Sequence, residues 1–101
     1  MITPDDDTAA QWIGTLLDHG IRVPEDFAVV SIGNTSLARL FRPQITSVDH
    51  NFETHLTTAL AILESRAAGH ADCGLFHLCQ PRLVVRSSSV RAPALMAVNQ
   101  R

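Results

Sequence analysis

The sequence of 101 residues predicts a small α/β fold with a mostly parallel sheet. Stretches with helical spacing of apolar residues alternate with short apolar runs, and this alternation is typical of α/β proteins. One of the runs, residues 27–32, is apolar at five of its six positions. A strand without regular polar alternation is typical of a parallel sheet that is covered on both faces.

The first helix is expected to begin near Thr3, which can cap it, with Pro4 at the first helical position. Three aspartates at residues 5–7 then lie near the positive end of the helix dipole, and Gly20 is suited to end the helix. Trp12 is expected to pack in the core or in an interface. The apolar positions of this helix are Ala9, Trp12, Ile13, Leu16 and Leu17.

After a turn, the run at 27–32 is expected to form a buried strand, and the polar residues 33–36 form a loop at its carboxyl end. A short helix is expected at 37–41. It must end before Pro43, because a residue that precedes proline is disfavoured in the helical region. Residues 45–48 are expected to form the second strand.

The longest helix is predicted over residues 51–68, with Asn51 as its cap and Gly69 as its stop. Two further strands are expected at 74–79 and 83–87. The apolar stripe of the long helix consists of Phe52, Leu56, Ala59, Leu60, Leu63 and Ala67.

Composition excludes several classes of protein. A hydrophobic content of 46% with 18% charged residues argues against wholesale disorder. A net charge of −2 provides no basic face for binding nucleic acid. Two cysteines do not suggest a disulfide scaffold, and neither a secretory signal nor a membrane-spanning run is present, so we expect a cytoplasmic protein that does not bind membranes.

Residue types that can bind metal or catalyse reactions occur in the chain, but not at the spacing that such sites require. His70, Cys73, His77 and Cys79 are residue types that bind zinc, and three of them would share one face of a strand. Their spacing fits no zinc ribbon or finger, so a strand with two small apolar thiols and a half-exposed histidine is the favoured interpretation. No nucleophile elbow, phosphate loop or metalloprotease motif occurs, so we predict no enzyme, no metal and no cofactor.

Three runs, at residues 20–34, 42–48 and 81–88, carry a family resemblance by their order and spacing. They include Gly-Ile-Arg-Val-Pro-Glu-Asp, Arg-Pro-Gln-Ile-Thr-Ser-Val and Pro-Arg-Leu-Val-Val-Arg-Ser-Ser. The set resembles the carboxy-terminal part of the effector-sensing core of lactose/galactose-repressor (LacI) family transcription regulators. This resemblance covers the chain from about Asp5 to Arg91.

The resemblance implies a partial periplasmic-binding-protein-like, Rossmann-like α/β sandwich. In the family, two lobes close on a small molecule, and the chain crosses into the second lobe near the position of Val48. This chain would then hold incomplete parts of both lobes. Residues 1–89 are interpreted as the carboxy-terminal segment of the sugar-binding, effector-sensing domain, and residues 90–101 as a flexible tail.

Four residues are ligand-binding candidates by this resemblance: Asp5, Gly33, Asn34 and His50. Gly33 stands where the family places an effector-binding aspartate. Either Asn34 compensates for the missing carboxylate, or the effector is anionic and a carboxylate at this position would repel it. Some relatives that look like gluconate-operon repressors also have glycine there, so the expected effector is a small sugar or a sugar acid.

The resemblance also implies a homodimer whose interface includes Leu37, Leu40 and Phe41. Operator DNA would be bound only through a helix-turn-helix domain that is missing from this chain. Two alternatives remain open: a fragment of a transport-associated sugar-binding protein, and a dimerisation module without a ligand.

Overall fold

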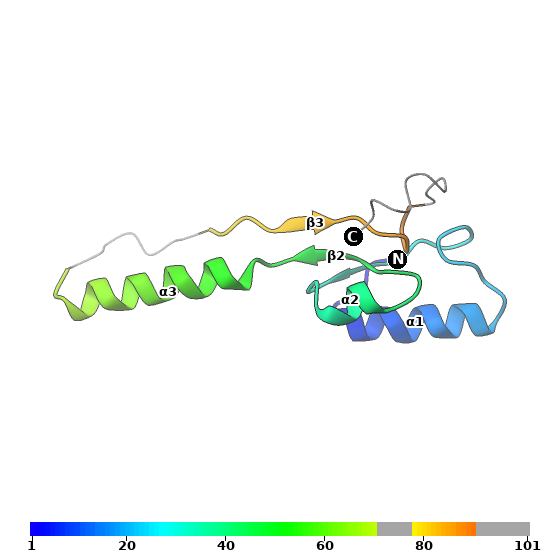
Figure 1. Cartoon of the computed structure of the whole chain (residues 1–101), viewed down its shortest axis with the longest axis horizontal. Helices are drawn as coiled ribbons and strands as arrows, with labels where there is room; N and C mark the ends of the chain where they lie inside the picture. Colours follow the sequence, from blue (N-terminus) through cyan, green and yellow to red (C-terminus); the bar gives the residue numbers. More distant parts are fainter. Residues whose placement is uncertain (71–77, 91–101) are drawn as a thin grey trace.

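The computed structural model describes residues 1–70 and 78–90, which form a body and a long arm (Figure 1). The body holds two helices that lie on the same side of the strands, while α3 extends away from it as the arm. The whole chain measures 60 × 28 × 19 Å. The elements are α1 (Asp6–Asp18), β1 (Val30–Ile32), α2 (Ser36–Leu40), β2 (Thr46–Asp49), α3 (Phe52–Ala67) and β3 (Arg82–Val84).

The sheet has the strand order β1-β2-β3. β1 and β2 are parallel, with Val30 opposite Thr46, whereas β2 and β3 are antiparallel, with Asp49 opposite Arg82. A further parallel bridge joins Ile2 to Val30 at the edge of β1. Two of these three pairings are parallel, which confirms the predicted α/β fold with a mostly parallel sheet.

The first helix begins at Asp6, and its cap is Asp5 rather than Thr3. The Asp5 carboxylate accepts a hydrogen bond of 2.7 Å from the backbone N–H of Thr8. The predicted cap was wrong because Thr3 belongs to the edge of the sheet, where its N–H donates to the Val30 carbonyl at 2.8 Å. Gly20 follows the helix with a φ of +76°, as expected of a residue that ends a helix.

The apolar core is small and is contributed mainly by one face of α1 and the segments packed on it. Trp12, which was expected in the core or an interface, is not in the core: it is 47% exposed on the outer face of α1. The Leu17 side chain is also largely exposed. The buried apolar residues are Ala9, Ile13, Leu16, Val23, Val29, Ala38 and Ile45.

β2 has its predicted length and is shifted by one residue, whereas β1 and β3 are shorter than predicted, because side chains and isolated backbone contacts replace the ladder at one end of each. β1 begins at Val30, three residues later than expected, since Phe27 is exposed and the Val29 N–H donates to the Ser88 carbonyl. β3 ends at Val84. Beyond it, the Ser88 hydroxyl donates to Val29 O at 2.6 Å and accepts from Thr46 N at 2.8 Å. Ser88 therefore crosslinks the starts of the two parallel strands.

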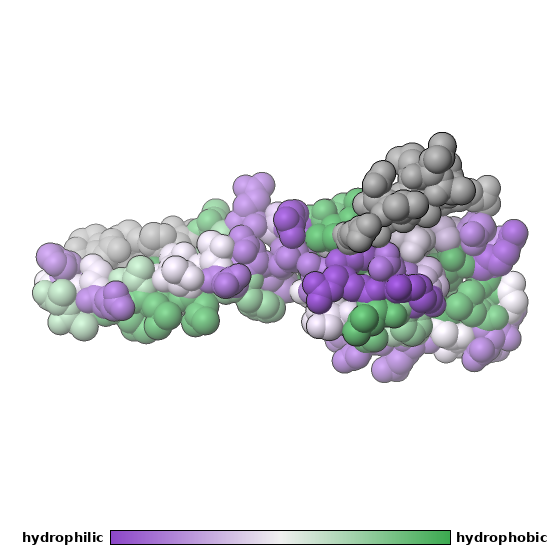
Figure 2. All heavy atoms as spheres, in the orientation of Figure 1, coloured by the Kyte–Doolittle hydropathy of each residue, from purple (hydrophilic) through white to green (hydrophobic). Residues whose placement is uncertain are grey.

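The arm helix α3 lies within one residue of its predicted limits at each end. Asn51 precedes it with a φ of +61° but makes no side-chain capping bond, contrary to the prediction. No residue of α3 is buried, so its apolar stripe faces solvent, and Figure 2 shows a hydrophobic band along the arm. The large exposed side chains of this stripe are Phe52, Leu56, Leu60 and Leu63, which are 51% to 68% exposed.

Some predictions fall outside the described residues. These are the tail from residue 91 onward, residues 74–77 of the predicted strand, and two of the zinc candidates, Cys73 and His77. Leu78 and Cys79 are described but lie in no strand. Over residues 1–70 and 78–90, no helix is long and apolar enough to cross a membrane, and no three metal-ligating side chains cluster.

Candidate functional site

The candidate site lies where β1 and β2 end and α1 begins. The loop after β1 is held against β2, because the Gly33 N–H donates to the Val48 carbonyl at 2.7 Å. Ligands of open α/β sheets bind outside the carboxyl ends of parallel strands. Polar side chains from four separate segments of the chain converge at this end of the sheet.

Asp6 forms the buried base of the site and is only 2% exposed. Its carboxylate accepts from the hydroxyls of Ser31 and Ser47, and from both the N–H and the hydroxyl of Thr35 at 2.6 Å. Burial alone would raise the pKa of Asp6, but these hydrogen bonds outweigh burial and leave the pKa below its ordinary value. Asp6 is therefore an ionised anchor that joins α1 to both strands and to the loop.

Asn34 projects from this loop with a φ of +54°, and its backbone N–H donates to the Ser47 hydroxyl at 2.8 Å. Both ends of its side-chain amide are engaged. The amide oxygen accepts from Arg86 Nη2 at 2.7 Å, and the amide nitrogen donates to Asp49 Oδ2 at 3.0 Å. Asn34 therefore connects the loop to two segments that are distant in sequence.

The two partners of Asn34 have opposite environments. Asp49 lies near the surface and also accepts from the Asn51 N–H at 2.8 Å; the Asn51 and Asn34 hydrogen bonds hold its pKa below the ordinary value. Arg86 is 2% exposed and donates through Nη1 to the Ile45 carbonyl at 2.8 Å. Burial lowers the pKa of Arg86, and its Nε has no hydrogen-bond partner among the described residues.

The predicted ligand-binding residues lie around this network. Asp5 is exposed, and its pKa is lowered because Thr8 donates to its carboxylate, chiefly through the backbone N–H. Gly33 has a φ of +135°, and a Cβ atom there would lie 3.6 Å from Asp6 Oδ2. His50 follows Asp49, is half-buried, and places its ring centroid 5.1 Å from that of Phe52.

The structure brings Gly33 and Asn34 together in one loop and sets Asp5 and His50 beside two residues of the network. Among the described residues, no hydrogen bond joins Asp5 or His50 directly to Asn34. The exposed carboxylate of Asp5 can accept hydrogen bonds from hydroxyl groups of a small molecule, and the half-buried imidazole of His50 can donate or accept them.

Sequence patterns missed the residues that hold this site together. Asp6 carried a usable signal, because it lies three, seven and ten residues before three buried positions of the α1 stripe and so shares their face. A second signal for the polar centre was the single serine in each of two short strand runs, at Ser31 and Ser47. The missed residues are Asp6, Ser31, Ser47, Asp49 and Arg86.

The predicted dimer residues lie on and just after α2. Leu40 is 75% exposed, Leu37 is half-buried, and Phe41 is half-buried against the core. An exposed leucine of this size leaves apolar surface in contact with water on the body of the molecule.

Comparisons with known proteins agree on one family. The profile of the periplasmic binding protein-like domain matches residues 1–89. The chain is 31% identical over 84 residues to the HTH-type transcriptional regulator GalS of Salmonella typhimurium, covering 83% of this chain and 25% of that protein. It is 30% identical over 93 residues to GalR of Escherichia coli, covering 92% of this chain and 27% of that protein.

The chain also superposes on solved structures of transcription regulators. A LacI-type transcription regulator from Bifidobacterium animalis superposes with a TM-score of 0.80 at 29% identity, covering 89% of this chain and 32% of that chain. The complex of the transcriptional regulator CelR with cellobiose superposes with a TM-score of 0.81 at 27% identity, covering 87% and 27%. The chain spans about a quarter of the length of the curated relatives that it matches.

Proposed function

The chain belongs to the periplasmic binding protein-like domain family, in the form found in LacI-type transcription regulators, and we propose that it forms one wall of an effector site and part of a dimer interface. Its role is recognition rather than catalysis, because the polar groups at the strand ends can bind a ligand but do not include a nucleophile next to a general base. We place this sensing role in the cytoplasm, where such a regulator meets operator DNA.

The observation that carries this proposal is the engagement of Asn34 at the carboxyl ends of both parallel strands. Its amide joins the loop after β1 to Asp49 at the end of β2, through a hydrogen bond of 3.0 Å. In the sequence, His50 directly follows Asp49, one end of this link, and the exposed Asp5 directly precedes Asp6, whose carboxylate accepts from Thr35 of the same loop. A ligand at this end of the sheet would meet groups from α1, β1 and β2 together.

The ligand class we propose is a small sugar or sugar acid. Carboxylate, amide and imidazole groups suit ligand hydroxyls, and the adjacent rings of His50 and Phe52 offer apolar surface to a sugar ring. Gly33 contributes no carboxylate to the loop, which favours a ligand that carries its own negative charge. CelR, which this chain resembles, was solved with cellobiose.

Titration of the isotope-labelled chain followed by amide NMR spectra tests the effector site. We would add neutral monosaccharides and their aldonic acids in parallel. The expected result is saturable shifts of residues 33–35 and 49–51, with weaker binding by Asp5→Asn, which keeps a residue that caps helices well. Asp7→Asn, a change at the next exposed aspartate, is the matched control. Shifts absent from these segments with every ligand would reject the site.

Dimerisation is the second part of the proposal, and the exposure of Leu40 supports it. A ligand-free dimerisation module, or a segment of a sugar-transport protein, would share this fold. The first would dimerise without any sugar response. We assign operator binding to a separate domain of a longer regulator, because this chain has a net charge of −2 and no helix-turn-helix motif.

A further inference from the structure

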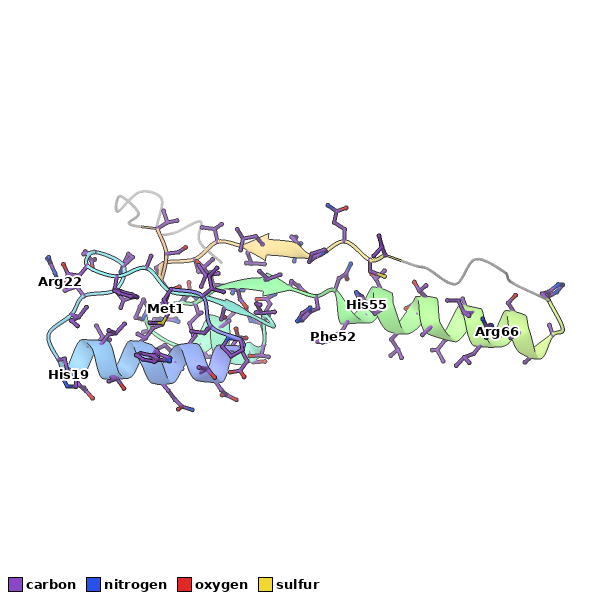
Figure 3. The ribbon with its side chains drawn as sticks, turned by 180° about the vertical axis from the view of Figure 1, so that it is seen from behind. Met1, His19, Arg22, Phe52, His55 and Arg66 are labelled. Atoms are coloured by element: carbon purple, nitrogen blue, oxygen red, sulfur yellow. The ribbon has the colours of Figure 1, made fainter. Side chains whose placement is uncertain are left out.

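The arm is connected to the body through β2 and β3. Asp49 is the last residue of β2 and contacts the first residue of β3. β2 ends at Asp49, which lies opposite Arg82 where β3 begins, and the two side chains approach to 3.6 Å. The Asp49 carboxylate also accepts from the N–H of Asn51, the residue of positive φ that precedes α3. Figure 3 shows Phe52 at the near end of α3 and Arg66 far from the body. The position of Asp49 therefore bears on the direction of the whole arm.

Asn34 supplies a side-chain contact between this junction and the body, in addition to the backbone hydrogen bond from the Gly33 N–H to the Val48 carbonyl. Arg86 can only donate hydrogen bonds, whereas the Asp49 carboxylate can only accept them. A reversed Asn34 amide would face its NH₂ group to the guanidinium and its oxygen to the carboxylate, so both contacts would become repulsive. The orientation of the Asn34 amide is thus fixed from both sides.

Arg86 is the fixed end of this chain of contacts. Its guanidinium is buried against backbone and amide oxygens, and it forms no ion pair with the described residues. Burial of an unpaired charge opposes folding, so its presence here calls for a role in holding geometry. One fork nitrogen is anchored at Ile45 O and the other reaches Asn34. A lysine ammonium, which is a single point, cannot reproduce that arrangement.

We infer that Arg86 is a positioning residue that holds the Asn34 amide against Asp49, and that this contact couples the loop after β1 to the direction of α3. A ligand hydroxyl or carboxylate that engaged Asn34 would then alter the hold on the arm; this last step rests on the proposed effector site.

An exchange of the two side chains tests the coupling. In Asn34→Asp, two carboxylates face each other and the link breaks, while Arg86 keeps its acceptor. Adding Asp49→Asn restores it in reverse: the new amide donates to residue 34, and its oxygen still accepts from the Asn51 N–H. Residual dipolar couplings of α1 and α3 report whether the helices share one alignment. We expect shared alignment in the native chain, its loss in Asn34→Asp and its recovery in the double variant.

Three further variants complete the design. Arg86→Lys should lose the shared alignment while the amide signals of α1 stay in place. Asp49→Ala changes a residue near the surface and should also lose the shared alignment. It replaces Asn34→Asp in the test if that variant does not fold. Arg82→Gln removes only an exposed ion pair, so this variant should keep the shared alignment of α1 and α3.

The outcomes separate cleanly. The inference is overturned if the native helices share no alignment, if Asn34→Asp and Asp49→Ala both retain it, or if the double variant fails to restore it. No ligand is added in these measurements. A failed effector titration therefore does not affect the alignment result, and a failed alignment test does not affect the titration.

Discussion

The carboxylate of Asp6 accepts a hydrogen bond from the Ser47 hydroxyl at 2.8 Å, which joins the first turn of α1 to the middle of β2. Ser47 in turn accepts from the Asn34 N–H, and its Oγ lies 3.1 Å from that of Ser31, whose hydroxyl also donates to Asp6. A small polar centre therefore connects the helix, both parallel strands and the site loop. Because the apolar core is small, this centre has a large share in placing Gly33 and Asn34.

Asp6→Asn is expected to destabilise the chain by about 3 kcal/mol, because an amide NH₂ group would replace an acceptor that faces N–H and O–H donors. The change keeps the size of the side chain, so packing is not the cause. Urea unfolding followed by circular dichroism measures the loss.

Asp7→Asn is the control for that loss. Asp7 is exposed in the same turn, and its substitution should change the unfolding free energy by no more than about 0.5 kcal/mol. Equal effects of the two substitutions would show that helix-end charge, and not the buried network, accounts for the stability.

Stability should fall in acid, and Asp6 should contribute to that fall. The folded-state pKa of Asp6 is lowered, so its contribution is fully present above the unfolded value of about 3.9 and is lost as pH falls through the folded value. Asp5 and Asp49 have lowered pKa values and act in the same direction. Unfolding free energies from pH 6 to pH 3 should decline less steeply in Asp6→Asn. Parallel profiles would contradict the assignment.

The fold was predictable where the signal was local. The spacing of Ala9, Ile13 and Leu16 predicted the buried face of α1, and Gly20 and Gly69 both follow helices with positive φ. The start of α1 was not predictable in the same way. Thr3 and Asp5 are both good caps, and a non-local bond from Thr3 to β1 decides between them.

The candidate site was predictable in its position but not in its connections. The loop that carries Asn34 could be found from the end of an apolar run. Its partners Asp49 and Arg86 lie 15 and 52 residues further along the chain, and no spacing rule links positions so far apart. The pairing of β1 with β2 and the contacts of Arg86 with Ile45 and Thr46 bring these side chains together.

Gly33→Ala should destabilise the chain by about 1–3 kcal/mol, because a φ of +135° is strained for any residue with a side chain. Space is not limiting: the added Cβ would meet Asp6 Oδ2 at 3.6 Å, which is ordinary contact. Gly14→Ala is the opposite control. It lies inside α1 with open space around it, and should stabilise by about 0.5–1 kcal/mol.

Gly33→Asp should cost more than Gly33→Ala, because a second carboxylate would lie near that of Asp6 in addition to the backbone strain. Thermal unfolding of both variants at neutral pH gives the comparison. Equal melting temperatures would mean that an aspartate at this position turns away from Asp6 into solvent.

Leu40→Lys is expected to separate the proposed dimer into monomers. Burying one leucine side chain contributes about 1.5–3 kcal/mol, so replacing it by a charge should raise the dissociation constant at least ~10-fold. Light scattering during size exclusion gives the molar mass of each variant across a dilution series. Leu78→Lys is the matched control, since Leu78 is 86% exposed and lies outside α2. A native chain that is monomeric at every concentration would reject the proposed dimer. A dimer that survives Leu40→Lys would place the interface away from α2.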